Sequence, residues 1–440
     1  MNQFISISRR CILIPVFFAA AFVQRASAQV AAGTNLGLDT PYDFSQTTLT
    51  EAPQGYKPFY ISHYGRHGSR YAYSDIFYDE PHLLLENAAR TGNLTDFGKE
   101  FRERFNAAYP VFNGNMGLLS DMGRDQQKRI GRQMYERFPE AFPGGAGVWA
   151  VSSESMRSVM SMSAFCVGLA GCDSTLRIRI EQSPAQLCCT NPRSKDNSRN
   201  VERLNPPTPE ALDEDAGKFF TRYVDTDAIM RHIFKNPRKA VTALLSDPDY
   251  HPDRFGTSPG TAVWHLWVFA AGMINIDEDY NFDDLFTPAQ WETMYRADCY
   301  LRWREYFKYQ AACCQVLDDI LQDCRSHVLS REKGAKLRFG HDHVMMPLLS
   351  ILGVDDYAVI PARPEDCYKT YPTYNVTMAC NMQFVLYEKE DGSGDILVKF
   401  LYNGREHRLP IETEMFPYYK WSDFETLFEK SLAAFPVIAE

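Results

Sequence analysis

The clearest chemical signal in the chain is a short basic segment, residues 63–70, with the sequence HYGRHGSR. Arg66 and Arg70 can each hold phosphate oxygens through two N–H groups, because the guanidinium fork matches that geometry. His67, between them, has a ring nitrogen that can attack phosphorus as a nucleophile. The segment follows an apolar run, and α/β proteins place ligand sites at the ends of strands. The pattern therefore favours a catalytic phosphate-binding loop over a solvated basic turn.

A second polar cluster, residues 340–343 (GHDH), also follows a predicted strand. In such a cluster His341 can bind phosphate and Asp342 can protonate a leaving group. The alternative interpretation makes Asp342 the N-cap of the following helix. Both interpretations can hold together, because the start of a helix also favours anions.

These two clusters together resemble the histidine acid phosphatases, the larger branch of the histidine phosphatase family. The family pattern R-H-G-x-R stands here as residues 66–70, and the distal H-D pair stands as His341-Asp342. Residues 119–126 are similar to the L-[TS]-x-x-G-x-x-Q helix start of the family. Arg157 sits where the family has a third phosphate-binding arginine. The four features occur in the family order over most of the chain.

The resemblance implies a phosphoric monoester hydrolase that works through a phosphohistidine on His67. Asp342 then protonates the leaving alcohol, and no metal or other cofactor is required. The groups that hold and stabilise the phosphate oxygens are Arg66, Arg70, Arg157 and His341. The expected partner is a small phosphomonoester, and the formal charge of −10 argues against general nucleic-acid binding.

The substrate class is indicated by further local likenesses. Residues 339–341, 347–353 and 283–306 are similar to multiple inositol polyphosphate phosphatases. That group usually has H-A-E in the distal motif, whereas this chain has Asp342 and His343 in the last two positions. Asp342 is therefore assigned as proton donor and His343 as a substrate-binding residue. Inositol polyphosphates, including phytate, are the expected substrates, with sugar or nucleotide phosphates as the alternative.

A basic loop at residues 193–199 offers further contacts for a polyphosphorylated substrate. Lys195 in this loop is a candidate ligand for an additional phosphate group. The alternative interpretation is a solvated surface loop, which is the usual role of such a charge run.

Two rival functions use the same residues differently. Four histidines, His63, His67, His341 and His343, could bind zinc or another transition metal. On an extended strand, however, His63 and His67 would lie roughly 13 Å apart, and the neighbouring arginines would repel a dication. The other rival is a non-catalytic inositol phosphate-binding protein, which would need neither His67 nor Asp342.

The elements that must position these residues alternate between strand and helix patterns. Short apolar runs predict strands at 57–63, 147–152, 176–180, 336–340, 383–388 and 396–402. Helical spacing predicts helices at 119–138, 155–169, 343–352 and 421–432. This alternation predicts an α/β fold with a mostly parallel central sheet flanked by helices.

The chain of 440 residues is long enough for a core domain with an insertion. Residues 183–331 are rich in helix formers and aromatic residues, which predicts an inserted, mainly helical cap domain. The α/β core then comprises residues 29–182 and 332–440.

The first residues predict export to the periplasm or the medium. Arg9 and Arg10 precede an apolar run at 12–23, and Ala26-Ser27-Ala28 fits a cleavage site, so residues 1–28 are read as a signal peptide. No later stretch has the length of a membrane span, so no stable membrane insertion is expected after cleavage. Ten cysteines follow the signal, and this even number in an exported chain suggests disulfide bonds.

Overall fold

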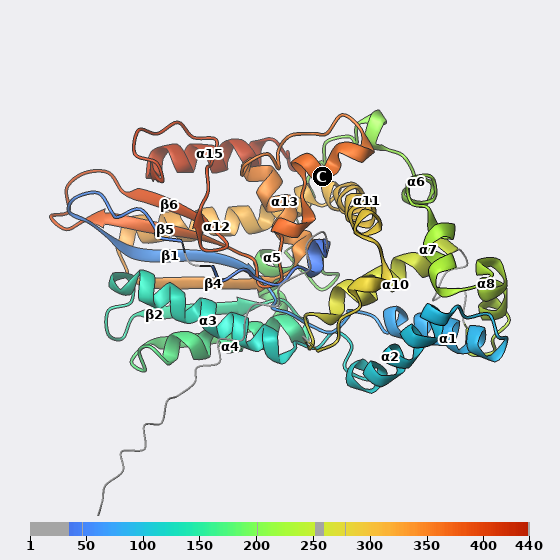
Figure 1. Cartoon of the computed structure of the whole chain (residues 1–440). Helices are drawn as coiled ribbons and strands as arrows, with labels where there is room; N and C mark the ends of the chain where they lie inside the picture. The colour runs from blue at the N-terminus through green and yellow to red at the C-terminus, as the bar shows by residue number, and fades with distance from the viewer. Residues whose placement is uncertain (1–34, 46, 200, 251–258, 278, 439–440) are drawn as a thin grey trace, which may run out of the picture.

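The computed structural model describes residues 35–45, 47–199, 201–250, 259–277 and 279–438, and Figure 1 shows their arrangement. The expected signal peptide, residues 1–28, lies outside the described residues. A central sheet with helices on both faces adjoins a second region built from helices (Figure 1). The expected α/β class with a helical addition is confirmed.

The central sheet has eight strands within the described residues, in the order β3-β2-β4-β1-β5-β6-β7, with β8 paired to β6. The strands are β1 (Tyr56–Arg66), β2 (Gly147–Ser152), β3 (Arg177–Glu181), β4 (Gly334–Gly340), β5 (Asn381–Lys389), β6 (Leu397–Tyr402), β7 (Arg405–Glu406) and β8 (Tyr418–Lys420). The sheet is mixed, because β1 to β4 pair in parallel whereas β5 to β8 pair antiparallel. Strand β4 is buried along its whole length, as expected for a central strand covered on both faces.

Two helix layers cover the sheet. Helices α3 (Asp121–Arg137) and α4 (Met156–Ala170) lie against one face, and α12 (Gln310–Ser330) and α15 (Trp421–Ala433) lie against the other (Figure 1). Helix α13 (Asp342–Leu352) follows β4 and contacts α12. In the part of the chain that is described, no helix combines the length and apolar character that a membrane crossing requires.

The helical region lies beyond one end of the sheet (Figure 1). Its helices from the expected insertion are α5 (Leu187–Thr190), α6 (Ala216–Tyr223), α7 (Thr226–Ile233), α8 (Pro237–Leu245), α10 (Pro259–Met273) and α11 (Pro288–Phe307). Helices α1 (Ile76–Arg90) and α2 (Asp96–Phe112) also pack here, with α1 against α8 and α10 and α2 against α7. The short helix α14 (Cys367–Thr370) contacts α11. The segment between β1 and α3 therefore contributes to the helical region together with the insertion.

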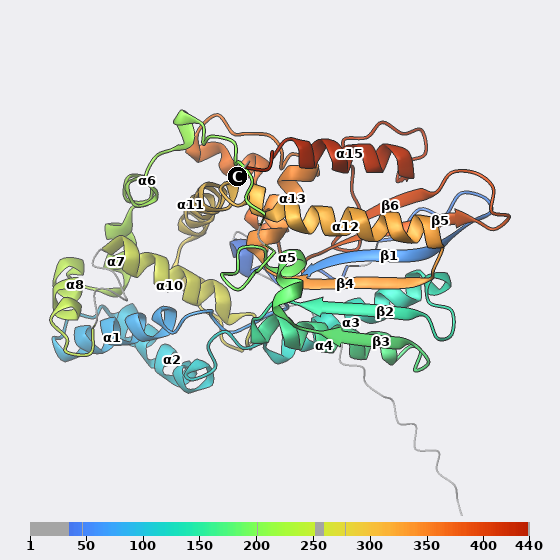
Figure 2. The same ribbon diagram turned by 180° about the vertical axis from the view of Figure 1, so that it is seen from behind.

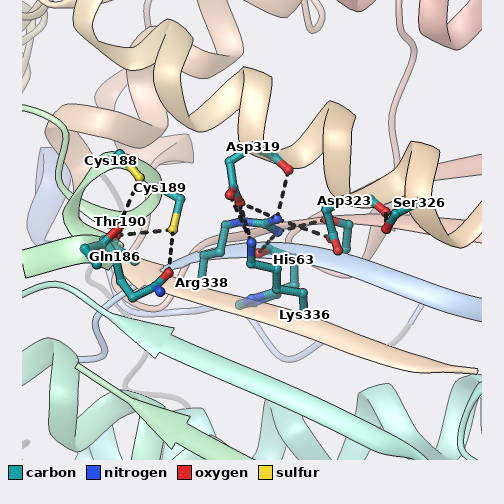
Figure 3. A network of polar contacts seen from close by, with 12 residues as sticks. His63, Gln186, Cys188, Cys189, Thr190, Asp319, Asp323, Ser326, Lys336 and Arg338 are labelled. Carbon is teal, nitrogen blue, oxygen red and sulfur yellow. Dashed lines mark hydrogen bonds and ion pairs between the residues drawn. The ribbon is translucent and has the colours of Figure 1, made fainter. Parts of the chain in front are cut away.

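A buried ion network fastens α12 to the sheet. Arg338 on β4 is fully buried, and its guanidinium contacts Asp319 at 2.6 Å and Asp323 at 3.2 Å. Lys336, two residues earlier on the same face, donates to both oxygens of Asp319. Figure 3 shows both carboxylates reaching from α12 toward these two cations. Since α12 follows α11 after only two residues, this network also anchors the end of the helical region nearest the sheet.

The parallel strands end at the same level, which brings three loops together. Arg66 at the end of β1 pairs with Gly340 at the end of β4. Ser152 at the end of β2 pairs with Phe339 of β4. Figure 2 shows α5 beside the ends of β2 and β4, where the sheet meets the helical region. The residues that follow β1, β2 and β4 therefore face one common space.

The cysteines do not form the disulfide bonds expected from their even number. All ten cysteines in the described residues are free thiols, and most of them are buried. The neighbours Cys188 and Cys189 lie in the short helix α5, and Cys313 and Cys314 lie in α12. Buried thiols of this kind act as small apolar side chains in the packed interior.

Candidate active site

The loop after β1 is held by backbone and side-chain contacts on several sides. The backbone N–H of His67 donates to the Gly340 carbonyl at 3.1 Å, and its carbonyl accepts from Ala379. The Gly68 N–H donates to Ser161 Oγ on α4 at 3.0 Å. Strands β1 and β4 and helix α4 thus fix the position of the histidine between them.

The start of α3 supports the same loop, as the motif at residues 119–126 suggested. A Cβ atom on Gly68 would collide with the Gly123 backbone, and one on Gly123 would collide with the Ser69 carbonyl. Gln126 Oε1 accepts from the Ser69 N–H at 2.9 Å. Only glycine at both positions permits this close approach of the helix to the loop.

Arg66 is fully buried and only partly satisfied by the protein. Its Nη1 donates to the carbonyls of Leu38 and Val376 at 2.6 and 2.9 Å. Its Nε and Nη2 have no hydrogen-bond partner. Leaving buried donors of a charged group unpaired is costly, so these two N–H groups indicate a site for an anion with acceptor oxygens.

Arg70 and Arg157 bring two more positive charges to the same space. Arg70 is nearly buried, and its Nη2 lies 3.7 Å from Asp39 Oδ1. Arg157 stands in the first turn of α4, and its Nε is also buried without a partner. Burial, together with repulsion by Arg70 and Arg66, lowers the pKa of Arg157 to about 10. Charges arranged in this way disfavour the empty site and favour one occupied by an anion.

His67 is neutral and has a defined tautomer. Its Nδ1 lies 2.9 Å from the Gly68 carbonyl, which can only accept a hydrogen bond, so Nδ1 carries the proton. The lone pair is therefore on Nε2. Burial, followed by the charges of Arg157 and Arg66, holds the pKa of His67 well below its ordinary value. The ring is thus an unprotonated nucleophile that the surrounding cations keep neutral.

His341 faces His67 from the end of β4, with the two ring centroids 5.7 Å apart. Its Nε2 lies 3.0 Å from Ser153 Oγ, in the loop after β2. Its Nδ1 is buried without a partner. Burial and the neighbouring His343 keep the pKa of His341 well below its ordinary value. A neutral imidazole in this position can donate to or accept from a bound phosphate.

Asp342 is the first residue of α13, and His341 is its N-cap, so the alternative reading of Asp342 as the N-cap is wrong. Asp342 Oδ2 accepts a hydrogen bond from Tyr306 Oη at 2.7 Å. Its Oδ1 lies 3.6 Å from Arg66 Nε. Burial raises the pKa of Asp342, but the charge of Arg66, the neighbouring His343, the Tyr306 hydrogen bond and the charge of Arg302 together outweigh burial and hold the pKa well below its ordinary value. The carboxyl group is therefore ionised while the site holds no anion.

His343 belongs to a short relay of hydrogen bonds. Asn191 donates through Nδ2 to both oxygens of Glu154, at 3.0 and 3.3 Å, which directs its Oδ1 to His343. His343 Nε2 lies 3.1 Å from this oxygen and must donate to it. The ring also stacks on His341, with centroids 4.8 Å apart. Burial lowers the pKa of His343 to about 4; Asp342 opposes this shift, and arginines such as Arg193 add to it.

These side chains line a cavity of about 390 Å³. Five arginines and four carboxylates contribute to its wall, so the wall has a net positive charge although the whole chain is acidic. The charged lining residues are Arg66, Arg70, Arg157, Arg193, Arg302, Asp39, Asp298, Glu305 and Asp342. The remaining lining residues are Leu38, His67, Tyr73, Asn191, Trp267, Val268, Tyr306 and His343.

The structure brings most of the expected site residues together and leaves one outside. His67, Arg66, Arg70, Arg157, Asp342 and His343 line the cavity, and His341 lies beside His67. Lys195 is exposed and does not line the cavity. Arg193, in the same loop, does line the cavity, and its guanidinium lies over the Tyr309 ring.

Sequence reasoning missed the lining residues that come from the helical region. Asp298, Arg302 and Tyr306 recur at four-residue spacing on α11 and thus occupy one face of that helix. Asn191 follows the short helix α5. The spacing of the α11 residues and the family likeness of residues 283–306 were signals in the sequence, but neither says what this face of the helix contacts.

The four histidines considered as metal ligands do not form one cluster. The His63 ring packs against Phe165 and Phe339, with centroids 5.3 Å away in each case. Among the described residues, no group of three or more histidine, cysteine, aspartate or glutamate side chains could hold a metal ion. The arrangement instead gathers hydrogen-bond donors and positive charge around one neutral imidazole, as binding of a phosphoryl group requires.

Solved structures with a similar fold come from phosphatases. A multiple inositol polyphosphate phosphatase of Bifidobacterium longum, in complex with inositol hexasulfate, matches with a TM-score of 0.70 and 20% identity, over 89% of this chain and 97% of that one. The phytase of D. castellii matches with a TM-score of 0.63 and 14% identity, over 90% and 85%. The Hafnia alvei phytase matches with a TM-score of 0.52 and 16% identity, over 87% and 98%. At these identities the likeness concerns the fold.

A family model provides the assignment that the fold alone does not. None of the curated proteins matches the sequence significantly. Residues 65–403, however, match the model of the histidine phosphatase superfamily (branch 2). This range contains the loop with His67, the arginine of α4 and the His341-Asp342 pair. The chain therefore belongs to branch 2 of the histidine phosphatase superfamily.

Proposed function

We propose that this protein hydrolyses phosphomonoesters through a phosphohistidine formed on His67. The observation that carries the proposal is the set of unpaired donors around a neutral imidazole. Arg66 Nε and Nη2, Arg157 Nε and His341 Nδ1 are buried without partners beside His67. A phosphoryl group would satisfy these donors, and the guanidinium groups would stabilise the charge that develops on its oxygens.

In the first half of the reaction, Nε2 of His67 attacks phosphorus and the bond from phosphorus to the ester oxygen breaks. Asp342 gives its proton to the departing oxygen. This step needs a protonated carboxyl group, whereas Arg66 and the other groups around Asp342 hold the pKa of its carboxyl well below the ordinary value while no phosphate is bound. A bound phosphate offsets the charge of Arg66. The pKa of Asp342 therefore rises when substrate binds, so that the carboxyl group can hold the proton that it gives to the leaving oxygen.

In the second half, water attacks the phosphohistidine and the bond from nitrogen to phosphorus breaks. Asp342, now a carboxylate, accepts a proton from the attacking water and regains the protonated form that it had with substrate bound. Phosphate then leaves the arginine cluster. Arg66, Arg70 and Arg157 do in this scheme what a metal ion does in other phosphatases.

The decisive test compares wild-type protein with His67→Ala on p-nitrophenyl phosphate, in buffer with EDTA. We expect the turnover of the wild-type protein to be unchanged by the chelator. The turnover of His67→Ala should be lower than that of the wild-type protein by about 10⁴-fold or more. His407→Ala, which removes a surface histidine paired with Asp355, is the matched control and should keep full activity. Full turnover in His67→Ala would refute the nucleophile, and loss of wild-type turnover in EDTA would favour a metal-dependent hydrolase. Absence of turnover together with tight phosphate binding would favour a binding protein.

Inositol polyphosphates are the substrates we propose for this site. Arg193 and Arg302 line the cavity in addition to the three arginines nearest His67. They can bind phosphate groups other than the one being cleaved. The fold likeness to the Bifidobacterium longum enzyme, solved with inositol hexasulfate, adds support.

A substrate panel tests this specificity. We expect a higher kcat/KM for phytate than for glucose 6-phosphate or AMP. Arg193→Met and Arg302→Met should each lower kcat/KM for phytate by about tenfold. Their effect on kcat/KM for p-nitrophenyl phosphate should be much smaller. Arg199→Met, in the same loop as Arg193 but outside the cavity lining, is the control. Equal kcat/KM for all substrates would favour a broad-specificity acid phosphatase.

Export is part of the proposal and rests on the sequence of residues 1–28. Expression of the full chain in a bacterial host should yield an exported protein whose N-terminus is Gln29. Intact-mass measurement of the periplasmic or secreted fraction tests this expectation. Retention of the uncleaved chain in the cytoplasm would contradict it.

A further inference from the structure

A residue of the helical region makes a short contact with Asp342 that the proposed reaction does not yet use. Tyr306, in the last turn of α11, is buried, and its hydroxyl lies 2.7 Å from Asp342 Oδ2. The residue lies outside the motifs at 66–70, 119–126 and 341–342. It nevertheless lies closer to the Asp342 carboxyl group than Arg66 does, at 2.7 Å against 3.6 Å.

The direction of this hydrogen bond is fixed by chemistry. Burial, together with the charge of Asp342, raises the pKa of Tyr306 well above its ordinary value, so the phenol keeps its proton. An ionised carboxylate can only accept, so Tyr306 donates and Asp342 Oδ2 accepts. The second oxygen of Asp342, Oδ1, lies on the side of Arg66 Nε, at 3.6 Å. The two oxygens of the carboxyl group therefore have different neighbours.

We propose that Tyr306 is a positioning residue that occupies Oδ2 of Asp342, so that Oδ1 delivers the proton to the leaving oxygen. This inference rests on the proposed function, in which Asp342 is the proton donor. Oδ1 faces Arg66, whose unpaired N–H groups mark the place of the phosphate. A proton on Oδ1 is therefore next to the ester oxygen, whereas a proton on Oδ2 would meet the Tyr306 hydroxyl.

The proton balance of the reaction agrees with this assignment. As the bond between phosphorus and the ester oxygen breaks, the proton on Oδ1 moves to that oxygen and a carboxylate remains. The Tyr306 hydrogen bond stabilises this carboxylate, because a hydrogen bond to the charged form favours it. When water attacks the phosphohistidine, Oδ1 accepts the proton of the water. Tyr306 keeps its own proton throughout.

Several charged and titratable groups face Asp342 and set its ionisation together with Tyr306. They are Arg66 from β1, Arg157 from α4, Arg302 from α11 and His343 from α13 itself. Substrate binding changes the effect of the arginines, because phosphate offsets their charge. The Tyr306 hydroxyl does not depend on the substrate charge, so its removal should leave a separate signature in the pH profile.

The test compares Tyr306→Phe, Tyr300→Phe and Asp342→Asn with the wild-type protein. Tyr300 lies on the same helix, is buried, and donates to the carbonyls of Leu212 and Glu214 away from the cavity. Its variant therefore loses a tyrosine hydroxyl of the same helix without touching Asp342. The substrates are p-nitrophenyl phosphate, whose leaving group needs little protonation, and glycerol 2-phosphate, whose alkoxide needs a proton. Thermal melting establishes that each variant is folded.

For Tyr306→Phe we expect kcat on glycerol 2-phosphate to fall by about tenfold, with KM unchanged and kcat on p-nitrophenyl phosphate nearly unchanged. The alkaline limb of the rate profile should move up by about one pH unit, because Asp342 loses a hydrogen bond to its charged form. Tyr300→Phe should keep the wild-type profile on both substrates. An equal loss on both substrates with an unmoved alkaline limb would overturn the proposal, since it would indicate a merely structural role.

Failure of the underlying function gives a different result. If Asp342→Asn hydrolyses glycerol 2-phosphate as fast as the wild-type protein, Asp342 is not the donor, whatever Tyr306→Phe does. A measurement without turnover complements this test. Titration of the Asp342 carboxyl carbon by ¹³C NMR, assigned with Asp342→Asn, should show a higher pKa in Tyr306→Phe than in the wild-type protein. An unchanged titration would contradict the role of Tyr306.

Discussion

Nε2 of His343 donates a hydrogen bond to Oδ1 of Asn191 at 3.1 Å, and Asn191 is in turn held by Glu154. The relay connects the loop after β2, the segment after α5 and the first turn of α13. It fixes the ring of His343 against His341 at the wall of the cavity. The arrangement holds the ring in one orientation, which suits the substrate-binding role expected of His343.

Removal of the Asn191 amide should loosen that contact. We expect Asn191→Ala to raise KM for a phosphomonoester by about tenfold, with a smaller effect on kcat, because His343 loses the acceptor that orients its ring. Asn197→Ala is the matched control, since Asn197 is buried in the same loop but bonds to Pro192 and Gln315. Steady-state kinetics decide the matter. Equal KM values for the two variants would show that the relay does not orient His343.

Arg157 should lower the folding stability of the phosphate-free protein, although it contributes to phosphate binding in the site. Its guanidinium lies among other cations with its Nε unpaired, and its pKa is lowered to about 10. Arg157→Met should therefore raise the melting temperature of the phosphate-free protein by about 1–3 °C. The same variant should lose about 100-fold or more in kcat.

Inorganic phosphate provides the complementary readout for Arg157. Phosphate binds only the folded site and should raise the melting temperature of the wild-type protein more than sodium chloride of equal ionic strength. The rise should be much smaller in Arg157→Met. A variant that is less stable than the wild-type protein without phosphate would contradict the assignment of Arg157 as an unpaired site cation.

The ion network under α12 should be a major source of stability. Arg338→Met leaves Asp319 and Asp323 without their shared cation, and breaking a buried pair in this way costs about 3–5 kcal/mol. Arg179→Met, which removes an exposed arginine paired with Glu181, should cost about 1 kcal/mol or less. Urea unfolding of the two variants measures the difference. Similar losses for both would mean that the buried network contributes no more than a surface pair.

Much of this architecture could be predicted from the sequence because long buried runs leave a clear pattern. The strand expected at 147–152 is β2, and the one expected at 336–340 lies within β4. The helix expected at 343–352 is α13, which begins one residue earlier, at Asp342. The residues around His67 were predictable because R-H-G-x-R is local in the sequence.

Other features depend on tertiary contacts that no local pattern encodes. Tyr306 and Asn191 reach the site only because α11 and the segment after α5 fold over the strand ends. The position of Lys195 outside the cavity follows from the path of one loop, which a charge run does not specify. The antiparallel pairing of β5 with β1 was not evident from apolar runs, since these do not state direction. The cysteine count likewise could not show that the ten cysteines of the described residues are free thiols.

The fold should lose stability as the pH falls from 7 to 5. His63, His67 and His341 are buried and His343 is half-buried, and desolvation is the main cause of their lowered pKa values, about 3 for His63 and about 4 for His343. The unfolded chain binds protons at these residues near pH 6.5, whereas the folded chain does not. Their contribution is therefore complete above that pH and is lost below it, by about 1.4 kcal/mol per pH unit for each histidine.

Denaturant unfolding at several pH values, in phosphate-free buffer, measures this slope. His63→Leu removes one of the four groups without touching the cavity lining and should reduce the slope by about a quarter. A free energy of unfolding that stays constant between pH 7 and 5 would mean that these histidines titrate alike in the folded and unfolded chains.

The central claim, that His67 carries the phosphoryl group during turnover, is tested most directly by trapping the intermediate. The protein is mixed with p-nitrophenyl phosphate, quenched in alkali within milliseconds, digested and analysed by mass spectrometry, with Asp342→Asn included to slow hydrolysis of the intermediate. We predict one added phosphoryl group on the peptide that contains His67, stable to alkali and lost in acid, and absent from His67→Ala. A phosphoryl group found on another residue of the active enzyme would contradict the account. So would an active enzyme in which neither the wild-type protein nor Asp342→Asn carries any phosphoryl group.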